Sequence, residues 1–146
     1  MTDDFRHRTR VEVRFRDIDA FGHVNNAVVS SYVELARVRY LVDVLQVEPI
    51  GVMPLILAHI AIDYRSPIFF EDTVEIGSRV DWLGTSSIGM SHGLTAAADG
   101  RELAGSSSVL VTYDYEHNRP MPVPDAWRQA LATYEGHALE KPVATA

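Results

Sequence analysis

The sequence predicts an α+β fold in which an antiparallel sheet wraps around one long helix. Residues 26–45 are apolar over most of a helical circumference, as in a helix that is buried inside a domain. About four strand candidates joined by short turns follow this helix, which is the order typical of α+β folds with an antiparallel sheet. The chain of 146 residues fits one compact domain, and we expect its core at about residues 8–135.

The first part of the chain predicts a strand, a loop and then the helix. Residues 10–18 alternate between apolar and polar side chains, which indicates a half-buried strand. Residues 17–23 should form a loop in which Gly22 relieves a tight turn. In the helix that follows, five apolar residues share one face, namely Val29, Val33, Ala36, Tyr40 and Val44.

The second part predicts the sheet. Residues 55–64 are an almost continuous apolar run, which favours a buried strand. The remaining strands are expected at residues 73–83, 87–98 and 101–115, with Val74, Ile76, Val80 and Trp82 facing inward in the first of them. Prolines at 120, 122 and 124 exclude regular structure there, and Asp125 suits the cap of a short helix at 127–134. The tail from Gly136 is expected to fray.

Composition excludes several classes of function. The chain has no cysteine, which rules out disulfides and thiolate metal sites and suits a cytoplasmic location. A net charge of −7 argues against general nucleic-acid binding. The N-terminal residues lack the apolar core of a signal peptide, and no apolar run is long enough to span a membrane.

The candidate chemistry lies between the first strand and the helix. Asp19 could present a carboxylate at the helix N-terminus, where free N–H groups stabilise negative charge. Asn25 and Asn26 are good N-cap residues by type, and a cap is compatible with N–H groups that polarise a bound carbonyl. Asp17 is better explained as a loop or cap residue. His23 is a candidate general base, although a loop histidine is more often structural.

Other polar residues carry weaker signals. Glu34 and Arg37 lie one helical turn apart and suit a salt bridge. The histidine spacing fits no metal site, so we expect the histidines to be core or rim residues. The hydroxyls of Thr85, Ser86 and Ser87 could contact a phosphate-bearing ligand from their turn.

Two motifs resemble one protein family. The run Asp17-Ile18-Asp19-Ala20-Phe21-Gly22-His23-Val24-Asn25-Asn26, followed by Tyr32-Val33-Glu34-Leu35-Ala36-Arg37, is similar to the hotdog-fold acyl-CoA thioesterases, and in particular to the 4-hydroxybenzoyl-CoA thioesterase-like group. The match continues through Asp63-Tyr64-Arg65-Ser66-Pro67 and Glu71-Asp72, and it spans roughly residues 8–130.

The resemblance implies a fold, an activity and an assembly. It implies a hotdog fold whose Asp19 acts as nucleophile or general base, while the helix N-terminus at Asn25 and Asn26 holds the oxyanion. It also implies a homodimer or homotetramer with active sites at the interface, and an acyl-CoA or acyl carrier protein thioester as substrate. It implies no cofactor and no metal. The helix face with Val29 and Tyr32 and the strand with His59 would line the acyl tunnel. Many relatives carry an aromatic residue where this chain has Val29, which would reshape that pocket.

Two other functions fit the same fold. A non-catalytic acyl-CoA sensor would bind the thioester without hydrolysing it, but such proteins usually carry a DNA-binding segment for which this chain has no room. A dehydratase or hydratase would need a His paired with an acidic residue, and His23 lies only four residues after Asp19.

Overall fold

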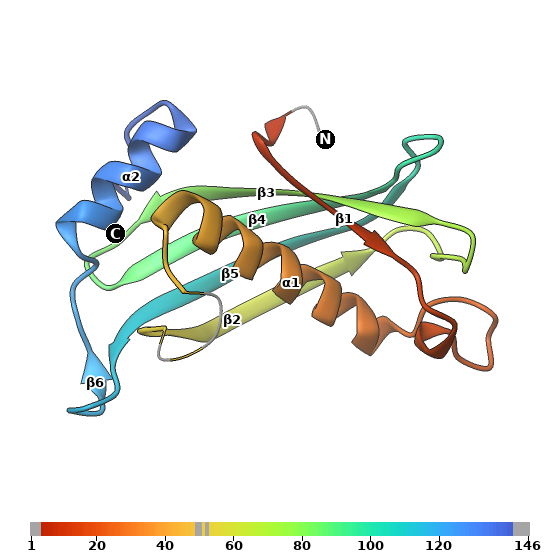
Figure 1. The fold of residues 1–146 in the computed structure, drawn as a ribbon, viewed down its shortest axis with the longest axis horizontal. Coiled ribbons are helices and arrows are strands. Elements are labelled where there is room, and N and C mark those ends of the chain that lie inside the picture. Colours follow the sequence, from red (N-terminus) through yellow and green to blue (C-terminus); the bar gives the residue numbers. More distant parts are fainter. Residues whose placement is uncertain (1–3, 49–50, 52, 142–146) are drawn as a thin grey trace, which may run out of the picture.

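A long helix, α1 (Asn26–Leu45), lies along the concave face of a curved antiparallel sheet (Figure 1). The computed structural model describes residues 4–48, 51 and 53–141. The strands are β1 (His7–Glu12), β2 (Leu55–Tyr64), β3 (Thr73–Leu83), β4 (Ser87–Ala96), β5 (Glu102–Asp114) and β6 (Arg119–Pro120). The sheet order is β1-β3-β4-β5-β2, and β6 pairs with β5 alone. The predicted α+β hotdog fold is therefore confirmed.

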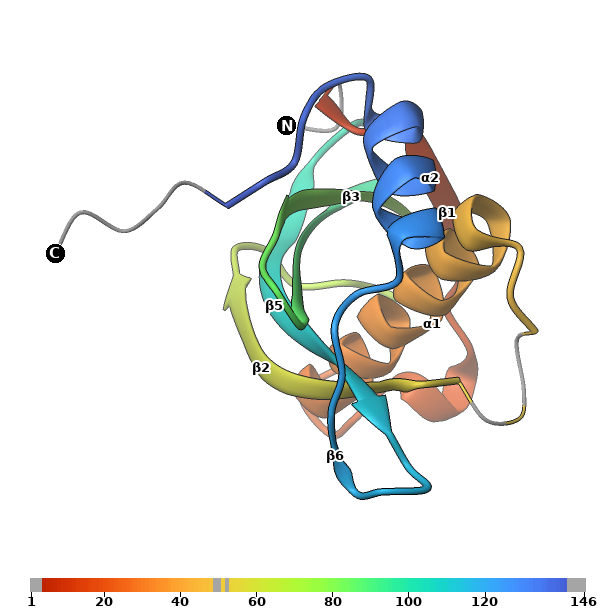
Figure 2. The same ribbon diagram turned by 90° about the vertical axis from the view of Figure 1, so that its left-hand side faces the viewer.

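The sheet curls around α1 and buries its apolar face (Figure 2). Val29, Val33, Ala36 and Tyr40 are buried, as the helical spacing predicts. The helix starts where the side chain of Asn25 accepts a hydrogen bond from the N–H of Ala27 (2.8 Å), so that Asn25 is the N-cap. Within the described residues, no helix has the length and apolar character needed to cross a membrane.

A polar row crosses the concave face and separates two apolar clusters. His7, Ser78, His92 and Ser106 lie in register on four strands, with one cluster on each side of them. Ser78 Oγ and His92 Nδ1 are 2.9 Å apart. Burial lowers the pKa of His92 to about 3, with further contributions from the charges of Arg37 and His7, so the His92 imidazole stays neutral. We call these four residues the polar row.

The first predicted strand is wrong in its second half. β1 ends at Glu12, and Phe15–Asp17 form a single 3₁₀ turn. The Asp17 carboxylate accepts a hydrogen bond from the N–H of Arg14 (3.0 Å), which closes this turn against the extended conformation that alternation favours.

Two predictions about burial are also wrong. β2 was predicted to be buried from its apolar run, but it is largely exposed because it is the edge strand of the sheet. In β3, the register shifts between Val80 and Trp82, and Leu83 rather than Trp82 is buried. The Trp82 ring instead lies against Gly89, where a Cβ would clash with it.

The C-terminal region is more ordered than expected. Arg119–Pro120 form the short strand β6 despite the prolines. Helix α2 (Asp125–Glu135) starts at Asp125 itself, with Pro124 as N-cap and no capping side chain. Residues 136–141 do not fray, because the N–H of Leu83 donates to Leu139 and the N–H of Lys141 donates to Leu83. Pro49 and residues 142–146 lie outside the described part of the chain.

A buried carboxylate attaches α2 to the rest of the molecule. Glu135 accepts hydrogen bonds from the hydroxyl of Tyr40 and from the N–H of Val80 (3.0 Å). Replacing Tyr40 with Phe should therefore lower the free energy of unfolding by about 1–3 kcal/mol, because the carboxylate stays buried with one donor fewer. Urea unfolding measures this loss. Tyr113→Phe is the control, and equal stability of the two variants would contradict the assignment.

Candidate active site

The loop between the 3₁₀ turn and α1 is closed by its own backbone. Ile18 and Val24 form an antiparallel bridge, and the N–H of Asp19 donates to the carbonyl of His23 (3.1 Å). The chain reverses at Gly22, whose φ of +85° favours glycine. The loop thus brings Asp19 back beside the start of α1.

One asparagine connects Asp19 to the helix. The side-chain amide of Asn25 donates to Asp19 Oδ2 (3.0 Å), while its oxygen accepts from the N–H of Ala27. The N–H of Phe21 donates to Asp19 Oδ1 (2.9 Å). Asp19 remains half-exposed, so its carboxylate is oriented and still reachable from outside.

Asp17 plays a different part and lies in the interior. Its Oδ2 accepts a 2.6 Å hydrogen bond from the hydroxyl of Tyr32, and its backbone carbonyl accepts one from the N–H of Asn25 (3.0 Å). Burial alone would raise the pKa of Asp17, but hydrogen bonds from Tyr32 and Arg14 and the charge of Arg14 hold it below 3.8. Asp17 therefore fixes the loop against α1 as a buried anion.

A pocket of about 220 Å³ opens beside the first turn of α1. Its helix-side wall includes His23, Asn26 and Val29. Its opposite wall is the segment that leaves β2, together with two residues of β5, namely Tyr64, Arg65, Ser66, Pro67, Ile68, Leu103 and Ala104. The hydroxyl of Tyr64 donates to the carbonyl of Asn26 (3.1 Å) and ties the two walls together. We call this cavity the helix-end pocket.

The sequence motifs contained part of this pocket without assigning it. The family resemblance includes the run Asp63-Tyr64-Arg65-Ser66-Pro67. Its residue types alone do not predict that it lies beside the start of α1. Leu103 and Ala104 carry no signal beyond a strand pattern, because the pairing of β2 with β5 brings them there.

Of three other candidate residues, His23 lines the helix-end pocket, whereas Tyr32 and His59 lie away from it. The ring of His23 contacts the carbonyl of Val24 (3.3 Å) and stacks on Phe21. Among the described residues, the partners of the Asp19 carboxylate are Phe21 and Asn25 rather than this ring. Tyr32 is buried and its hydroxyl donates to Asp17, and burial followed by this hydrogen bond raises the pKa of Tyr32. His59 is exposed in the middle of β2.

Thr85, Ser86 and Ser87 lie at the other end of the sheet from Asp19. Thr85 and Ser86 lie in the turn between β3 and β4, and Ser87 begins β4. Arg128 of α2 donates to the carbonyl of Thr85 (3.2 Å). Within one chain, this turn and the helix-end pocket are not brought together (Figure 1).

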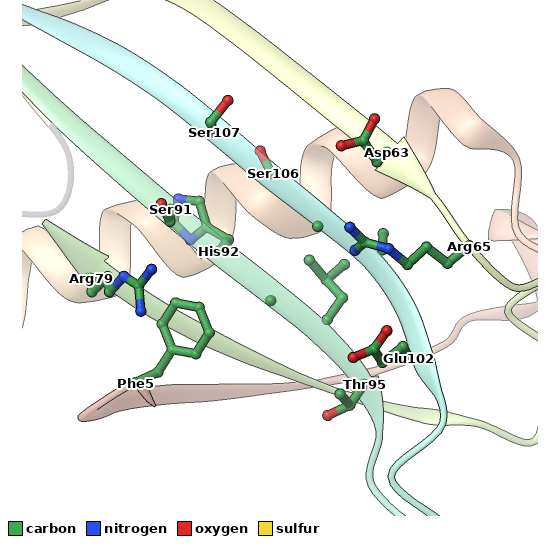
Figure 3. Close-up of a pocket in the computed structure, with 14 residues that line it drawn as sticks. Phe5, Asp63, Arg65, Arg79, Ser91, His92, Thr95, Glu102, Ser106 and Ser107 are labelled. Carbon is green, nitrogen blue, oxygen red and sulfur yellow. The ribbon is translucent and has the colours of Figure 1, made fainter. Parts of the chain in front are cut away.

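A second cavity, of about 300 Å³, lies on the convex face of the sheet (Figure 3). Its floor is formed by Gly93 and Gly105, which are paired in register on β4 and β5. Arg65 lies over Gly105, and Phe5 lies over Gly93. Arg65 and Ala104 border both this cavity and the helix-end pocket.

One group of potential metal ligands occurs in the described residues. Asp114, Glu116 and His117 lie in the β5–β6 hairpin, with ligand atoms within 4.8 Å of one another. The Asp114 carboxylate already binds the His117 ring (2.7 Å) and the N–H of Glu116 (2.9 Å), which accounts for the cluster as part of a turn.

Similar proteins are thioesterases. The model of the thioesterase-like superfamily matches residues 13–131. The long-chain acyl-CoA thioesterase FadM of Escherichia coli is 26% identical over 126 residues, which cover 85% of this chain and 96% of FadM. A thioesterase from Thermus thermophilus, solved with coenzyme A and zinc, is 41% identical with a TM-score of 0.85 and covers 94% of this chain and 99% of its own. A 1,4-dihydroxy-2-naphthoyl-CoA thioesterase from Synechocystis shares the fold, with a TM-score of 0.75 at 18% identity over 86% of this chain and 95% of its own.

Asp17 should make stability depend on pH in a specific direction. Its pKa in the folded state is below the ordinary 3.8, so its contribution is fully present above that value and is lost as the pH falls through the folded pKa. Asp17→Asn should cost about 1–3 kcal/mol of unfolding free energy at neutral pH, and the difference from wild type should shrink below about pH 4. Urea unfolding over a pH series measures this.

The exposed Glu71→Gln, in the loop between β2 and β3, is the control and should follow the wild-type profile. A constant difference between wild type and Asp17→Asn down to pH 3 would show that the Asp17 charge does not stabilise the loop.

Proposed function

The chain belongs to the thioesterase-like superfamily, and on this premise we propose that it hydrolyses acyl-CoA to a free acid and coenzyme A. The observation that carries the proposal is the half-exposed carboxylate of Asp19, held by Asn25 at the N-terminus of a buried helix. This arrangement places a base or nucleophile beside a group that stabilises negative charge, which is what attack on a thioester carbonyl requires.

Asp19 acts on the carbonyl carbon in one of two ways. It removes a proton from the water that adds to this carbon, or it adds to the carbon itself and water hydrolyses the resulting anhydride. In either case, the carbon–sulfur bond breaks and coenzyme A leaves as a thiol. The carbonyl oxygen becomes negative in the transition state, and the first turn of α1 stabilises it through the N–H of Asn26 and the positive end of the helix dipole.

The helix-end pocket would receive the acyl group. Val29, Ile68 and Leu103 supply an apolar wall, while Asn26 is at its polar end. The match to FadM favours acyl-CoA over a carrier-protein thioester. The carboxylate of Asp19 binds Asn25 and the N–H of Phe21 rather than the His23 ring, so a paired His–acid dehydratase site is not favoured.

We also propose that the protein is a homodimer and that it is located in the cytoplasm. The lack of cysteine is compatible with this reducing compartment. β2 ends the sheet as a ten-residue strand with one unpaired edge, and its first charged residue is Asp63. The opposite edge strand, β1, is shorter and carries Arg8, Arg10 and Glu12. Long apolar edges are normally covered, whereas charged edges are protected from pairing. We therefore pair β2 with β2 of a second copy.

Asp19→Asn tests the proposed chemistry. The amide neither takes a proton nor attacks carbon, so kcat should fall at least about a hundredfold while the fold is retained. Thiol release from short, long, branched and aromatic acyl-CoAs measures it, with Asp99→Asn in an exposed turn as the control. Near-wild-type turnover of Asp19→Asn would refute the role of Asp19, and a wild type without activity on the whole panel would refute the thioesterase proposal.

Val29 should set the size of the acyl pocket. Val29→Phe fills the helix-end pocket, and kcat/KM for long-chain acyl-CoA should fall about tenfold relative to short-chain acyl-CoA. Val29→Ala enlarges the pocket and should shift the ratio in the opposite direction. The ratio of the two substrates within each variant corrects for differences in folding, and an unchanged ratio in both variants would remove Val29 from the pocket.

A further inference from the structure

Arg37 is a buried cation for which the described residues supply only a distant, exposed counter-ion. It is only 6% exposed, and its Nη1 has no hydrogen-bond partner among the described residues. The carboxylate paired with it is that of Glu34, at 4.0 Å from Nη2, and the Glu34 side chain is 71% exposed. A guanidinium stays charged in proteins, and a buried charge is strongly unfavourable unless it is paired.

Glu34 and Arg37 face the open edge of the sheet. Both line a groove of about 220 Å³ between α1 and β2, whose other walls include Leu41, Leu55 and Leu57. Because β2 is the edge strand, this groove opens towards whatever covers the edge. A closer counter-ion than the described residues supply would therefore arrive with the molecule that pairs with β2.

The geometry of α1 and β2 fixes which residue that would be. The two elements run antiparallel, since Tyr64 at the end of β2 bonds Asn26 at the start of α1, while Leu55 packs in the same cluster as Leu45. An antiparallel β2 pair over its full length has its twofold axis at the strand midpoint, between residues 59 and 60. The midpoint of α1 lies between residues 35 and 36.

We propose that Glu34 of each copy is the counter-ion of the partner's Arg37. Because the two ends of α1 lie by the two ends of β2, an axis at the midpoint of β2 passes near the midpoint of α1. Glu34 and Arg37 lie on either side of the midpoint of α1 and at equal sequence distance from it, so this axis brings each one towards the other residue of the partner. This inference rests on the dimer of the proposed function. It gives the dimer two identical ion pairs, and it holds the two α1 helices, each with its own Asp19, in a fixed relation across the interface.

Exchanging charges between two chains tests this pairing. Glu34→Arg alone places like charges opposite each other in the homodimer, and so does Arg37→Glu alone. Each variant should raise the dimer dissociation constant at least about a hundredfold in sedimentation velocity. Mixing them restores opposite charges at both positions, so native mass spectrometry should find the heterodimer far above its statistical share, with thioesterase activity recovered.

An ion pair within one chain gives different results. In that case, each variant loses the pair regardless of its partner, and mixing restores nothing. Control variants are Glu12→Arg on β1 and Arg39→Glu, an exposed residue of α1, neither of which should change dimerisation. Wild-type dimerisation of both single variants, or a statistical mixture, would overturn the pairing.

Two further measurements keep the test decisive. Arg37→Glu buries an anion, so its folding is checked by circular dichroism. If it does not fold, Glu34→Gln, which alters an exposed side chain, should still weaken the dimer at least about tenfold. A dimer as tight as wild type in that variant would overturn the pairing. A wild-type protein that is monomeric would instead overturn the proposed dimer. A wild-type protein that dimerises but does not hydrolyse acyl-CoA would overturn only the proposed activity.

Discussion

The burial of α1 in the concave face of the sheet is the constraint on which the rest of the structure depends. A helix of this length has an apolar face that the flat side of a small sheet would not cover, so the strands curve around it (Figure 2). The curvature leaves the helix N-terminus at the rim of the sheet, between the loop at residues 18–24 and the exit of β2. The N-terminal end of the helix thus lies at the surface, while the body of the helix is buried.

Asp17 and Asp19 are only two positions apart, but they have different roles because the fold gives them different hydrogen-bond partners. Asp17 lies inside, where the Tyr32 hydroxyl and the Arg14 N–H satisfy it, and it holds the loop in place. Asp19 lies at the rim with the side chain of Asn25, which belongs to the helix cap. The 3₁₀ turn at Phe15–Asp17 makes this separation possible, because in an extended strand the two side chains would share a face.

Sequence patterns predicted local structure well and burial less well. The helix at 26–45 was predicted at both ends, since its start has a cap residue, Asn25, and its apolar spacing is periodic. The wrapped sheet also followed from the order of the elements. The exposure of β2 could not be predicted, because apolar side chains indicate that a strand is covered but not by which molecule. The same limit applies to the site, where Tyr32 has the right spacing for a tunnel wall but its hydroxyl binds Asp17.

The pairing of β2 with β5 has a consequence for the order in which the chain folds. β2 has no neighbouring strand of its own chain until β5 is synthesised, after both β3 and β4. The walls of the helix-end pocket come from the end of β2 and from Leu103 and Ala104 of β5, so this cavity closes only with the last long strand. Contacts between segments so distant in sequence form slowly, and during that interval an apolar strand is exposed on the nascent chain. The region that would perform catalysis is therefore completed late in synthesis. Until then, the growing chain can associate with another unfolded copy through the exposed strand.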